Sequence, residues 1–519
     1  MVQQHTEFIV HTLNKHGLIG AKQDVLNTYK TGFPGPAPLG GGTSIYPNSL
    51  YAAEGATLFI GSLGGYKLLF LVSDRELPGE IPGTREVIGG IHVLSAEINW
   101  ETYQAVQHVV PFIRPVSLRR ERTTLGCGDR LGLATAGHIR AARAYEIHPV
   151  LAQQSIRELN LTGRTYRDVV SDAAFLVLQE GFERGYGADG DHLKTLNDIG
   201  VALDAEMPMI TLDLTEQMNP QPASWDDEKI AREFSELPDS VTSLVRDRYA
   251  GKTFPFPSGD IAISDTEAKR CALMYWKAMD FTGEVDEFLR SKRGDSYDLE
   301  VSIDETTAPT VPAHHLFIAS ELQRRNVTVN SLAPRFIGEF QKGVDYIGDT
   351  DEFERQFASH CDIAKAYGKY KISIHSGSDK FSVYPIIGRM TGHRVHVKTA
   401  GTSWLEALRT VAHRNSTLFR SIVKKAYTYF PEAQKLYHIT ADLNKIPVIE
   451  AVSDADLPKF LDEPESRQLL HITYGGLLND SEVRGDFFTL LEEYEQLHYR
   501  FVESHMEKHI TTLGVPKQL

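Results

Sequence analysis

The sequence is poor in cysteine and in positive charge, and it lacks any long apolar run. Its 519 residues include only three cysteines, Cys127, Cys271 and Cys361, with no CxxC pair. Such scattered cysteines argue against a disulfide framework or a thiolate metal site, and they fit a reducing cytoplasm. The formal net charge of -15 argues against a phosphate-binding surface, because nucleic-acid binding needs clustered lysine and arginine. We therefore expect no nucleic-acid partner.

No apolar run approaches the roughly 18 residues that a membrane-spanning helix needs. Residues 1–15 mix polar and apolar side chains and lack the basic and apolar regions of a signal peptide. With 41% apolar and 24% charged residues, the composition is that of an ordinary globular protein. We expect a cytoplasmic protein without a membrane partner, and whether it forms a homo-oligomer is left open.

The pattern of the sequence changes twice along the chain. Residues 1–115 are rich in glycine and in short apolar runs between turns, which predicts a small β-rich N-terminal domain. Residues 116–410 alternate between strand and helix patterns and carry a long insert at about 214–298, which predicts a lid or an accessory helical layer. Residues 411–519 have the amphipathic spacing of helices, which predicts a helical C-terminal region.

Eight candidate strands can be counted within residues 116–410. Eight strands with helices between them predict an α/β fold of the (β/α)8 TIM-like barrel type, with an open doubly wound sheet as the alternative. In both folds the carboxyl ends of the strands carry the chemistry. The candidate strands are Thr123–Cys127, Val150–Ser155, Glu183–Ala188, Met209–Asp213, Leu299–Asp304, Val329–Ala333, Lys371–His375 and Arg394–Lys398.

Histidines and an aspartate gather at three of these strands. The fragment Gly185–Lys194 places Asp191 and His192 in a glycine-rich turn after a strand, where they are candidates for a base and a metal ligand. A helix N-cap is the alternative for the aspartate. His375 ends its strand, and His396 lies within the next one. Adjacent strands could bring the three histidines around one divalent cation, although a strand histidine can equally be a hydrogen-bonded core residue.

A pair of carboxylates ends the candidate strand at residues 299–304. Alternation places Glu300, Ser302 and Asp304 on one face of this strand. Glu305 follows at its exit. An acid inside a barrel is costly unless it is paired or bound to metal. Asp304 or Glu305 is therefore a candidate general acid or base, and a turn carboxylate that caps the loop is the alternative.

Cations near the strand ends point to an anionic substrate. Lys380 and Lys398 follow or end strands, and Arg335 and Lys342 lie after another. Any of them could hold a substrate carboxylate, which favours an acidic sugar. Surface ion pairing is the alternative for Arg335 and Lys342.

The fragment Gly126–Gly132 is glycine-rich, but it lacks the GxGxxG spacing of a dinucleotide site. Asp129 and His138 are instead substrate-binding candidates at the mouth of the first barrel strand, with a turn-forming role as the alternative. The sequence also has no GxSxG, P-loop or HExxH signature. A dinucleotide cofactor is therefore not expected.

Five fragments of the chain, taken in order, form a more specific signal than any one of them. They are Gly126–Gly132, Gly187–Lys194, Ser331–Phe340, Ile374–Ser382 and His396–Trp404. Together they resemble the bacterial tagaturonate epimerase family, over about residue 115 to the C-terminus and loosely over the N-terminal domain.

The resemblance implies a metal-dependent barrel enzyme that interconverts D-tagaturonate and D-fructuronate. It implies Asp191 as the proton acceptor beside the ligand His192, and His375 as a second ligand. An acid of the Asp304 and Glu305 pair would be the proton donor. His396 is a further candidate ligand, and the identity of the cation is open among Zn, Mn, Ni and Co.

The inverted carbon of such a substrate lies β to the ketone, so its hydrogen is not acidic enough for simple enolisation. A base can instead remove the hydroxyl proton and cleave the neighbouring carbon–carbon bond in a retro-aldol step, leaving an enediolate. Rotation of the aldehyde and re-addition would then invert the centre. A transient hydride transfer would need a nicotinamide site that the sequence lacks. A metal-dependent isomerase or aldolase, and a non-catalytic carbohydrate-binding protein, are the alternatives.

Overall fold

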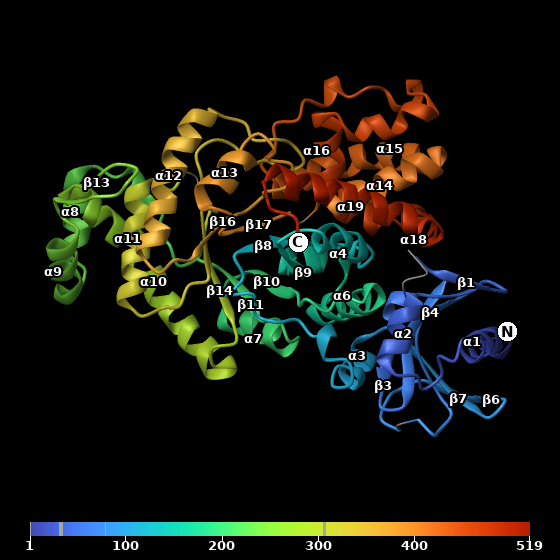
Figure 1. The fold of residues 1–519 in the computed structure, drawn as a ribbon. Coiled ribbons are helices and arrows are strands. Elements are labelled where there is room, and N and C mark those ends of the chain that lie inside the picture. The colour runs from blue at the N-terminus through green and yellow to red at the C-terminus, as the bar shows by residue number, and fades with distance from the viewer. Residues whose placement is uncertain (1, 31–34, 78, 305–307, 400, 519) are drawn as a thin grey trace.

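The computed structural model describes residues 2–30, 35–77, 79–304, 308–399 and 401–518, and a closed barrel of parallel strands lies at its centre (Figure 1). The order around the barrel is β10-β11-β14-β15-β16-β17-β8-β9. The (β/α)8 prediction is thereby confirmed, and the open sheet is excluded. The strands are β8 (Thr123–Gly126), β9 (His148–Ser155), β10 (Gly187–Leu193), β11 (Met209–Asp213), β14 (Asp298–Ile303), β15 (Ser331–Pro334), β16 (Lys371–Ile374) and β17 (Val395–Lys398).

One predicted strand was misplaced by several residues. β10 begins at Gly187, whereas the sequence suggested a strand over 183–188 with Asp191 in the turn beyond it. That turn prediction is wrong, because β10 pairs with β9 on one side and with β11 on the other. A Cβ on Gly190 would lie 2.8 Å from the side chain of Ala202, so only glycine fits there. Sheet pairing thus overrides the turn propensity of this stretch.

Helices surround the barrel and complete most of its β/α units. Strand ends and helix starts meet at one mouth of the barrel, where the longer connections are the segment between β11 and α10 and residues 335–349 between β15 and α12. The surrounding helices are α4 (Thr135–Arg143), α5 (Ile156–Thr162), α6 (Tyr166–Glu180), α7 (Leu196–Asp204), α10 (Asp265–Arg293), α11 (Pro312–Arg324), α12 (Thr350–Ala366), α13 (Tyr384–Thr391) and α14 (Thr402–Arg414).

A seven-stranded antiparallel sheet forms the N-terminal part of the chain, as predicted, with two helices before it. Alternate residues divide between its faces: Leu58 and Ile60 pack toward the barrel, and Phe59 packs under the two helices. The elements are α1 (Val2–Lys15), α2 (Gln23–Lys30), β1 (Ala37–Gly40), β2 (Thr43–Ile45), β3 (Tyr51–Ala53), β4 (Ala56–Leu63), β5 (Tyr66–Ser73), β6 (Thr84–Ile88), β7 (Ile91–Glu97) and, after the sheet, α3 (Trp100–Val106).

The insert between β11 and β14 forms an accessory layer on the outer side of the barrel, at the left of Figure 1. It contains α8 (Asp227–Ser235), α9 (Asp239–Arg248) and the small hairpin of β12 (Lys252–Phe254) and β13 (Ile261–Ile263). The long helix α10 ends the insert and returns the chain to the barrel. The predicted helical layer is therefore present.

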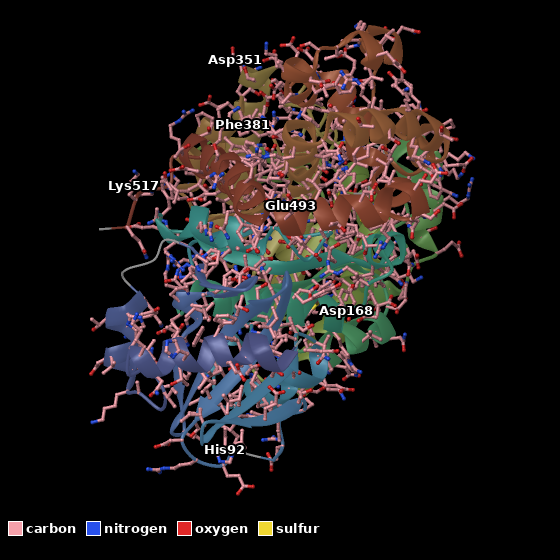
Figure 2. The ribbon with its side chains drawn as sticks, turned by 90° about the vertical axis from the view of Figure 1, so that its right-hand side faces the viewer. His92, Asp168, Asp351, Phe381, Glu493 and Lys517 are labelled. Atoms are coloured by element: carbon pink, nitrogen blue, oxygen red, sulfur yellow. The ribbon has the colours of Figure 1, made fainter. Side chains whose placement is uncertain are left out.

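The C-terminal region is helical, as predicted, and has a hydrophobic core of its own. Its last helix packs along α4 and α14 and so ties the region to the barrel. Figure 2 shows the N-terminal sheet, with His92 at its outer end, below the barrel, and the C-terminal helices above. The helices are α15 (Ser416–Ala433), α16 (Pro464–Ile472), α17 (Tyr474–Leu478), α18 (Ser481–Glu493) and α19 (Glu495–Thr512). The predicted domain boundaries near residues 115 and 410 stay predictions.

No helix among the described residues is long and apolar enough to span a bilayer.

Candidate active site

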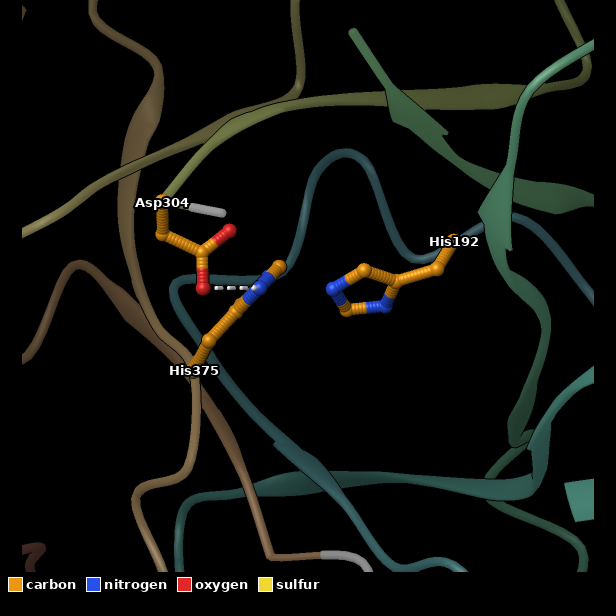
Figure 3. Close-up of side chains that lie close together, drawn as sticks. All are labelled: His192, Asp304 and His375. Carbon is orange, nitrogen blue, oxygen red and sulfur yellow. Dashed lines mark ion pairs between the residues drawn. The ribbon is translucent and has the colours of Figure 1, made fainter. Parts of the chain in front are cut away.

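Three side chains from three strands meet at the mouth of the barrel (Figure 3). His192 comes from β10, and Asp304 and His375 follow the last residues of β14 and β16. Potential ligand atoms of the three lie within 4.8 Å of one another. The imidazole rings of His192 and His375 have their centroids 5.0 Å apart, and His375 Nδ1 lies 3.1 Å from Asp304 Oδ2. The sequence predicted each of these residues for the site.

Each histidine is oriented by a buried carboxylate. His192 Nδ1 lies 2.8 Å from Asp191 Oδ1, and His375 Nε2 lies 2.7 Å from Glu300 Oε1. A carboxylate on one ring nitrogen fixes the orientation of the imidazole and directs the other nitrogen to the site. The ring nitrogens directed at the site are therefore Nε2 of His192 and Nδ1 of His375.

Lys398 holds the two orienting carboxylates together. Its Nζ lies 2.6 Å from Asp191 Oδ1, 2.9 Å from Glu300 Oε1 and 2.9 Å from Asp189 Oδ2, and it also donates to the hydroxyl of Thr211. All of these groups are buried. One cation among three carboxylates leaves a negative excess inside the barrel, which favours positive charge nearby.

The pKa values follow from this charge balance. Burial opposes the charged form of His375, but Asp304 and Glu300 raise its pKa to about 10. Burial also opposes ionisation of Asp191, yet Lys398 and His192 hold its pKa well below the usual range. Asp189 is different: burial, together with the charges of Asp191 and Glu300, raises its pKa to about 6 against the pull of Lys398. The negative charge of the buried carboxylates thus favours a positive charge at the barrel mouth.

The donor set fits a divalent metal ion. Two imidazole nitrogens and a carboxylate oxygen are a common ligand set of catalytic zinc and of other first-row ions, with further positions open to substrate. His375 Nδ1 is buried and, among the described residues, has no partner with hydrogen-bond geometry, although Asp304 is only 3.1 Å away. Two ligands of one ion would lie at such a separation without a hydrogen bond between them.

Cavities flank the ligand set on two sides. The larger, of about 650 Å³, is lined by Asp304 and His375 together with Lys342 and Tyr437. The smaller, of about 380 Å³, is lined by His192 and by residues of the neighbouring strand ends. A small polar molecule can therefore reach His192, Asp304 and His375 from the surface.

The structure does not bring His396 into the ligand set. His396 lies two residues before Lys398 on β17 and is therefore one layer deeper in the barrel. Its Nδ1 is 2.9 Å from the hydroxyl of Thr124, and burial lowers its pKa to about 3. His396 is thus a hydrogen-bonded core histidine, which is the alternative interpretation given in the sequence analysis. Glu305, the other predicted acid, lies outside the described residues.

The predicted substrate-binding residues have varied surroundings. Lys380 is buried and donates to the carbonyl oxygens of Gln341, Val344 and Ser378. These bonds hold a loop together, just as the pairs of Lys398 hold the barrel interior together, so neither lysine has its charge directed at a cavity. Arg335 does line the larger cavity.

Asp129 and His138 lie in and after the loop that follows β8. The Asp129 carboxylate accepts hydrogen bonds from the backbone of Leu131, Gly132 and Ala134, which is the turn-forming role left as the alternative. Burial lowers the pKa of His138 to about 4, despite the nearby charge of Asp129. Neither residue lines the cavities beside the ligand set.

Three residues of the site were not among the site residues predicted from the sequence. Glu300 was placed on the inner face of its strand, and the cost of burying its charge was a signal that it has partners. Asp189 could have been found by period-two alternation with Asp191 once β10 was placed correctly. Arg157, which lines both cavities, had no signal, because it lies one residue into a helix and far from any motif.

Comparisons with known proteins agree on one family. The family model described as tagaturonate epimerase matches residues 46–513. A curated tagaturonate/fructuronate epimerase from Thermotoga maritima is 37% identical over 493 residues, which cover 94% of this chain and 99% of that protein. The native crystal structure of fructuronate-tagaturonate epimerase from Cohnella laeviribosi is 44% identical and has a TM-score of 0.88, covering 92% of this chain and 97% of that one. A glycerol complex of the latter enzyme matches with a TM-score of 0.87 at the same identity over 91% of this chain and 96% of that one.

Proposed function

Since the chain belongs to the tagaturonate epimerase family, we propose that it interconverts D-tagaturonate and D-fructuronate with the help of one divalent cation. The protein is a carbohydrate epimerase, and its substrate is a small sugar acid. The observation that supports the metal is the convergence of His192, Asp304 and His375 from three strand ends beside two cavities. Zn, Mn, Ni and Co all suit this donor set.

A cation held by these three residues would supply a Lewis acid for the ketone oxygen and for the negative charge that develops during carbon–carbon cleavage. The protein residues around it carry the proton transfers and the positioning. Asp191 and Glu300 orient the two histidines, and Lys398 keeps both carboxylates ionised by its charge.

Asp191 is the proposed proton acceptor. Its contacts with His192 and Lys398 both fall on Oδ1, so Oδ2 is the atom that would take the hydroxyl proton of the substrate. The lowered pKa of Asp191 keeps the carboxylate in its accepting form at neutral pH. Asp304 is assigned to the cation, which leaves Glu305 as the proposed proton donor of the predicted pair.

The retro-aldol route remains the proposed chemistry. Loss of the hydroxyl proton cleaves the adjacent carbon–carbon bond and gives an enediolate and an aldehyde. The aldehyde carries the carboxylate of the uronate. After it rotates, the enediolate re-adds to its opposite face, and the returned proton restores the hydroxyl group with inverted configuration.

Metal removal tests this proposal. The protein is stripped with a chelator, single divalent ions are restored, and D-tagaturonate is followed by a separation that resolves D-fructuronate and three-carbon fragments. We expect conversion to fall by at least about a hundredfold without metal, because several kcal/mol of charge stabilisation are lost, and to return with one of the ions.

The products decide between the alternatives in the same experiment. Formation of three-carbon fragments as the main product would favour an aldolase, and movement of the carbonyl would favour a ketose isomerase. Full activity after complete metal removal would contradict the role assigned to the ligand set.

A further inference from the structure

The larger cavity beside the ligand set is rich in cationic side chains. Arg157, Arg335 and Lys342 line it, against the carboxylates of Asp304 and Glu339. Asp304 is the residue assigned to the cation, so among the described residues the rest of the lining has three basic side chains and one carboxylate. This differs from the chain as a whole, whose net charge is -15. A local excess of this sign attracts an anionic group.

Arg157 is the residue best placed to use that charge. It is exposed, and it is common to the two cavities that flank His192 and His375. Its guanidinium lies over the ring of Tyr437, with the central carbon 5.0 Å from the ring centroid. Among the described residues no carboxylate pairs with it, whereas the nearby Lys194 lies 3.5–3.8 Å from two carboxylates.

Tyr437 gives the guanidinium a fixed platform. The tyrosine is 8% exposed, and it comes from the C-terminal region and lines the same cavity as Asp304 and His375. A planar guanidinium on an aromatic face keeps its edge donors available for a bidentate partner. Carboxylate is the group whose geometry matches that edge.

Lys342 supplies a second cation in the same cavity. Its Nζ lies 3.0 Å from the hydroxyl of Ser376, the residue next to His375. The carbonyl group of Lys342 accepts a hydrogen bond from Gln468 of α16 at 3.2 Å, which anchors its backbone to the C-terminal region. Arg157, from the first turn of α5, and Lys342, from the loop between β15 and α12, therefore border the same cavity from different elements.

We propose that Arg157, assisted by Lys342, binds the carboxylate of the uronate substrate and makes the enzyme selective for sugar acids over neutral ketoses. The proposal rests on the function proposed above and gives it a substrate-selecting group. In the retro-aldol route the carboxylate belongs to the aldehyde fragment. The same contact therefore retains that fragment while the aldehyde group rotates and presents its opposite face to the enediolate. Arg157 takes part in no covalent step.

The test separates binding of charge from catalysis. Dissociation constants of D-gluconate and D-glucitol, an acid and a neutral polyol of equal chain length, are measured by calorimetry for the metal-loaded protein. We expect Arg157→Gln to weaken gluconate binding about 10- to 100-fold, since a hydrogen-bonded charge is lost, and to change glucitol binding by less than about threefold. Arg157→Lys should recover part of the gluconate affinity, because lysine restores the positive charge but not the bidentate hydrogen-bonding geometry of the guanidinium.

Turnover gives a second readout with a matched control. Arg157→Gln should lower kcat/KM for D-tagaturonate about 10- to 100-fold and leave kcat/KM for D-tagatose within about threefold. Arg232→Gln, an exposed arginine of α8 remote from the cavities, should change neither value. Equal effects of Arg157→Gln on the acid and on the neutral compound, or no effect on either, would overturn the proposal.

The two proposals fail in distinguishable ways. If the wild-type protein does not convert D-tagaturonate with any ion, the proposed function fails, while the gluconate and glucitol constants still test the carboxylate site. If the wild type converts D-tagaturonate and Arg157→Gln binds and converts the acids equally well, only the assignment of Arg157 fails.

Discussion

At the scale of single residues, Lys398 is the group on which the site geometry depends most. It contacts the carboxylates of Asp191 and Glu300, and each of these orients one histidine. We predict that Lys398→Met lowers metal affinity about 10- to 100-fold, because the partners of the ligands lose their own support. It should also destabilise the fold by about 3–5 kcal/mol, since buried carboxylates lose their cation. Metal titration and denaturant unfolding measure the two effects.

Lys371 is the matched control for this prediction. It is also a buried barrel lysine, but its Nζ contacts the carbonyl group of Leu118 and the hydroxyl of Thr124 at the other end of the barrel. Lys371→Met should leave metal affinity within about threefold, because it touches no group that orients a ligand. If both variants lose metal equally, general destabilisation and not orientation explains the effect of Lys398→Met.

At the scale of elements, the loop between β16 and α13 joins the barrel to the C-terminal helices. Asp379 in this loop lies 2.8 Å from Arg467 of α16 and 3.1 Å from His505 of α19. The backbone N–H of Asp379 donates to His509 at 2.9 Å. The residue has a φ of 63°, a conformation that needs such support in an aspartate. Because the loop starts at His375, these contacts help to place a proposed metal ligand.

We predict that Arg467→Met loosens this loop. Hydrogen exchange of residues 376–383 should rise, and kcat should fall about tenfold, because a displaced ligand is costly for catalysis. Arg420→Met is the control, since its pair with Asp454 lies at the surface of the C-terminal region. Unchanged exchange in the loop of Arg467→Met would show that the barrel alone positions His375.

At the scale of the whole molecule, buried neutral histidines make stability depend on pH. Burial lowers the pKa of His138, His360 and His498 to about 4. The unfolded chain takes up these protons near pH 6.5, before the folded protein does, so the stabilisation is complete above pH 6.5 and is lost as pH falls toward 4. Each group contributes on the order of 3 kcal/mol over that range.

Thermal unfolding of the metal-free protein checks this prediction, because the pH-dependent release of a bound metal ion then cannot contribute to the change in Tm. We expect the Tm to fall steadily between pH 6.5 and pH 4.5. His360→Gln should reduce the slope, since one titrating group is lost. A Tm that stays constant over this interval would show that the buried histidines are protonated in the folded state as well.

The sequence could predict much of the architecture and part of the site. Strand and helix periodicity located seven of the eight barrel strands within a few residues, and the strand-end rule located His192, Asp304 and His375. The sequence-based prediction of strand position failed at β10, because glycine and aspartate are typical of a turn, whereas pairing with a strand on each side makes this stretch a strand. It also grouped His396 with the other histidines, because spacing along a strand does not reveal depth in a barrel.

The amino-acid order by itself determined the barrel, the helical C-terminal region and the strands that carry the proposed ligands, because burial patterns and strand ends are local properties of the chain. Only the tertiary structure decided which charges neutralise one another. Lys398 and Arg157 are both cations near strand ends, yet one is enclosed by three carboxylates and the other lies on a tyrosine beside two cavities. That difference depends on distances between residues far apart in sequence, since electrostatic interactions are set by separation in space and by burial.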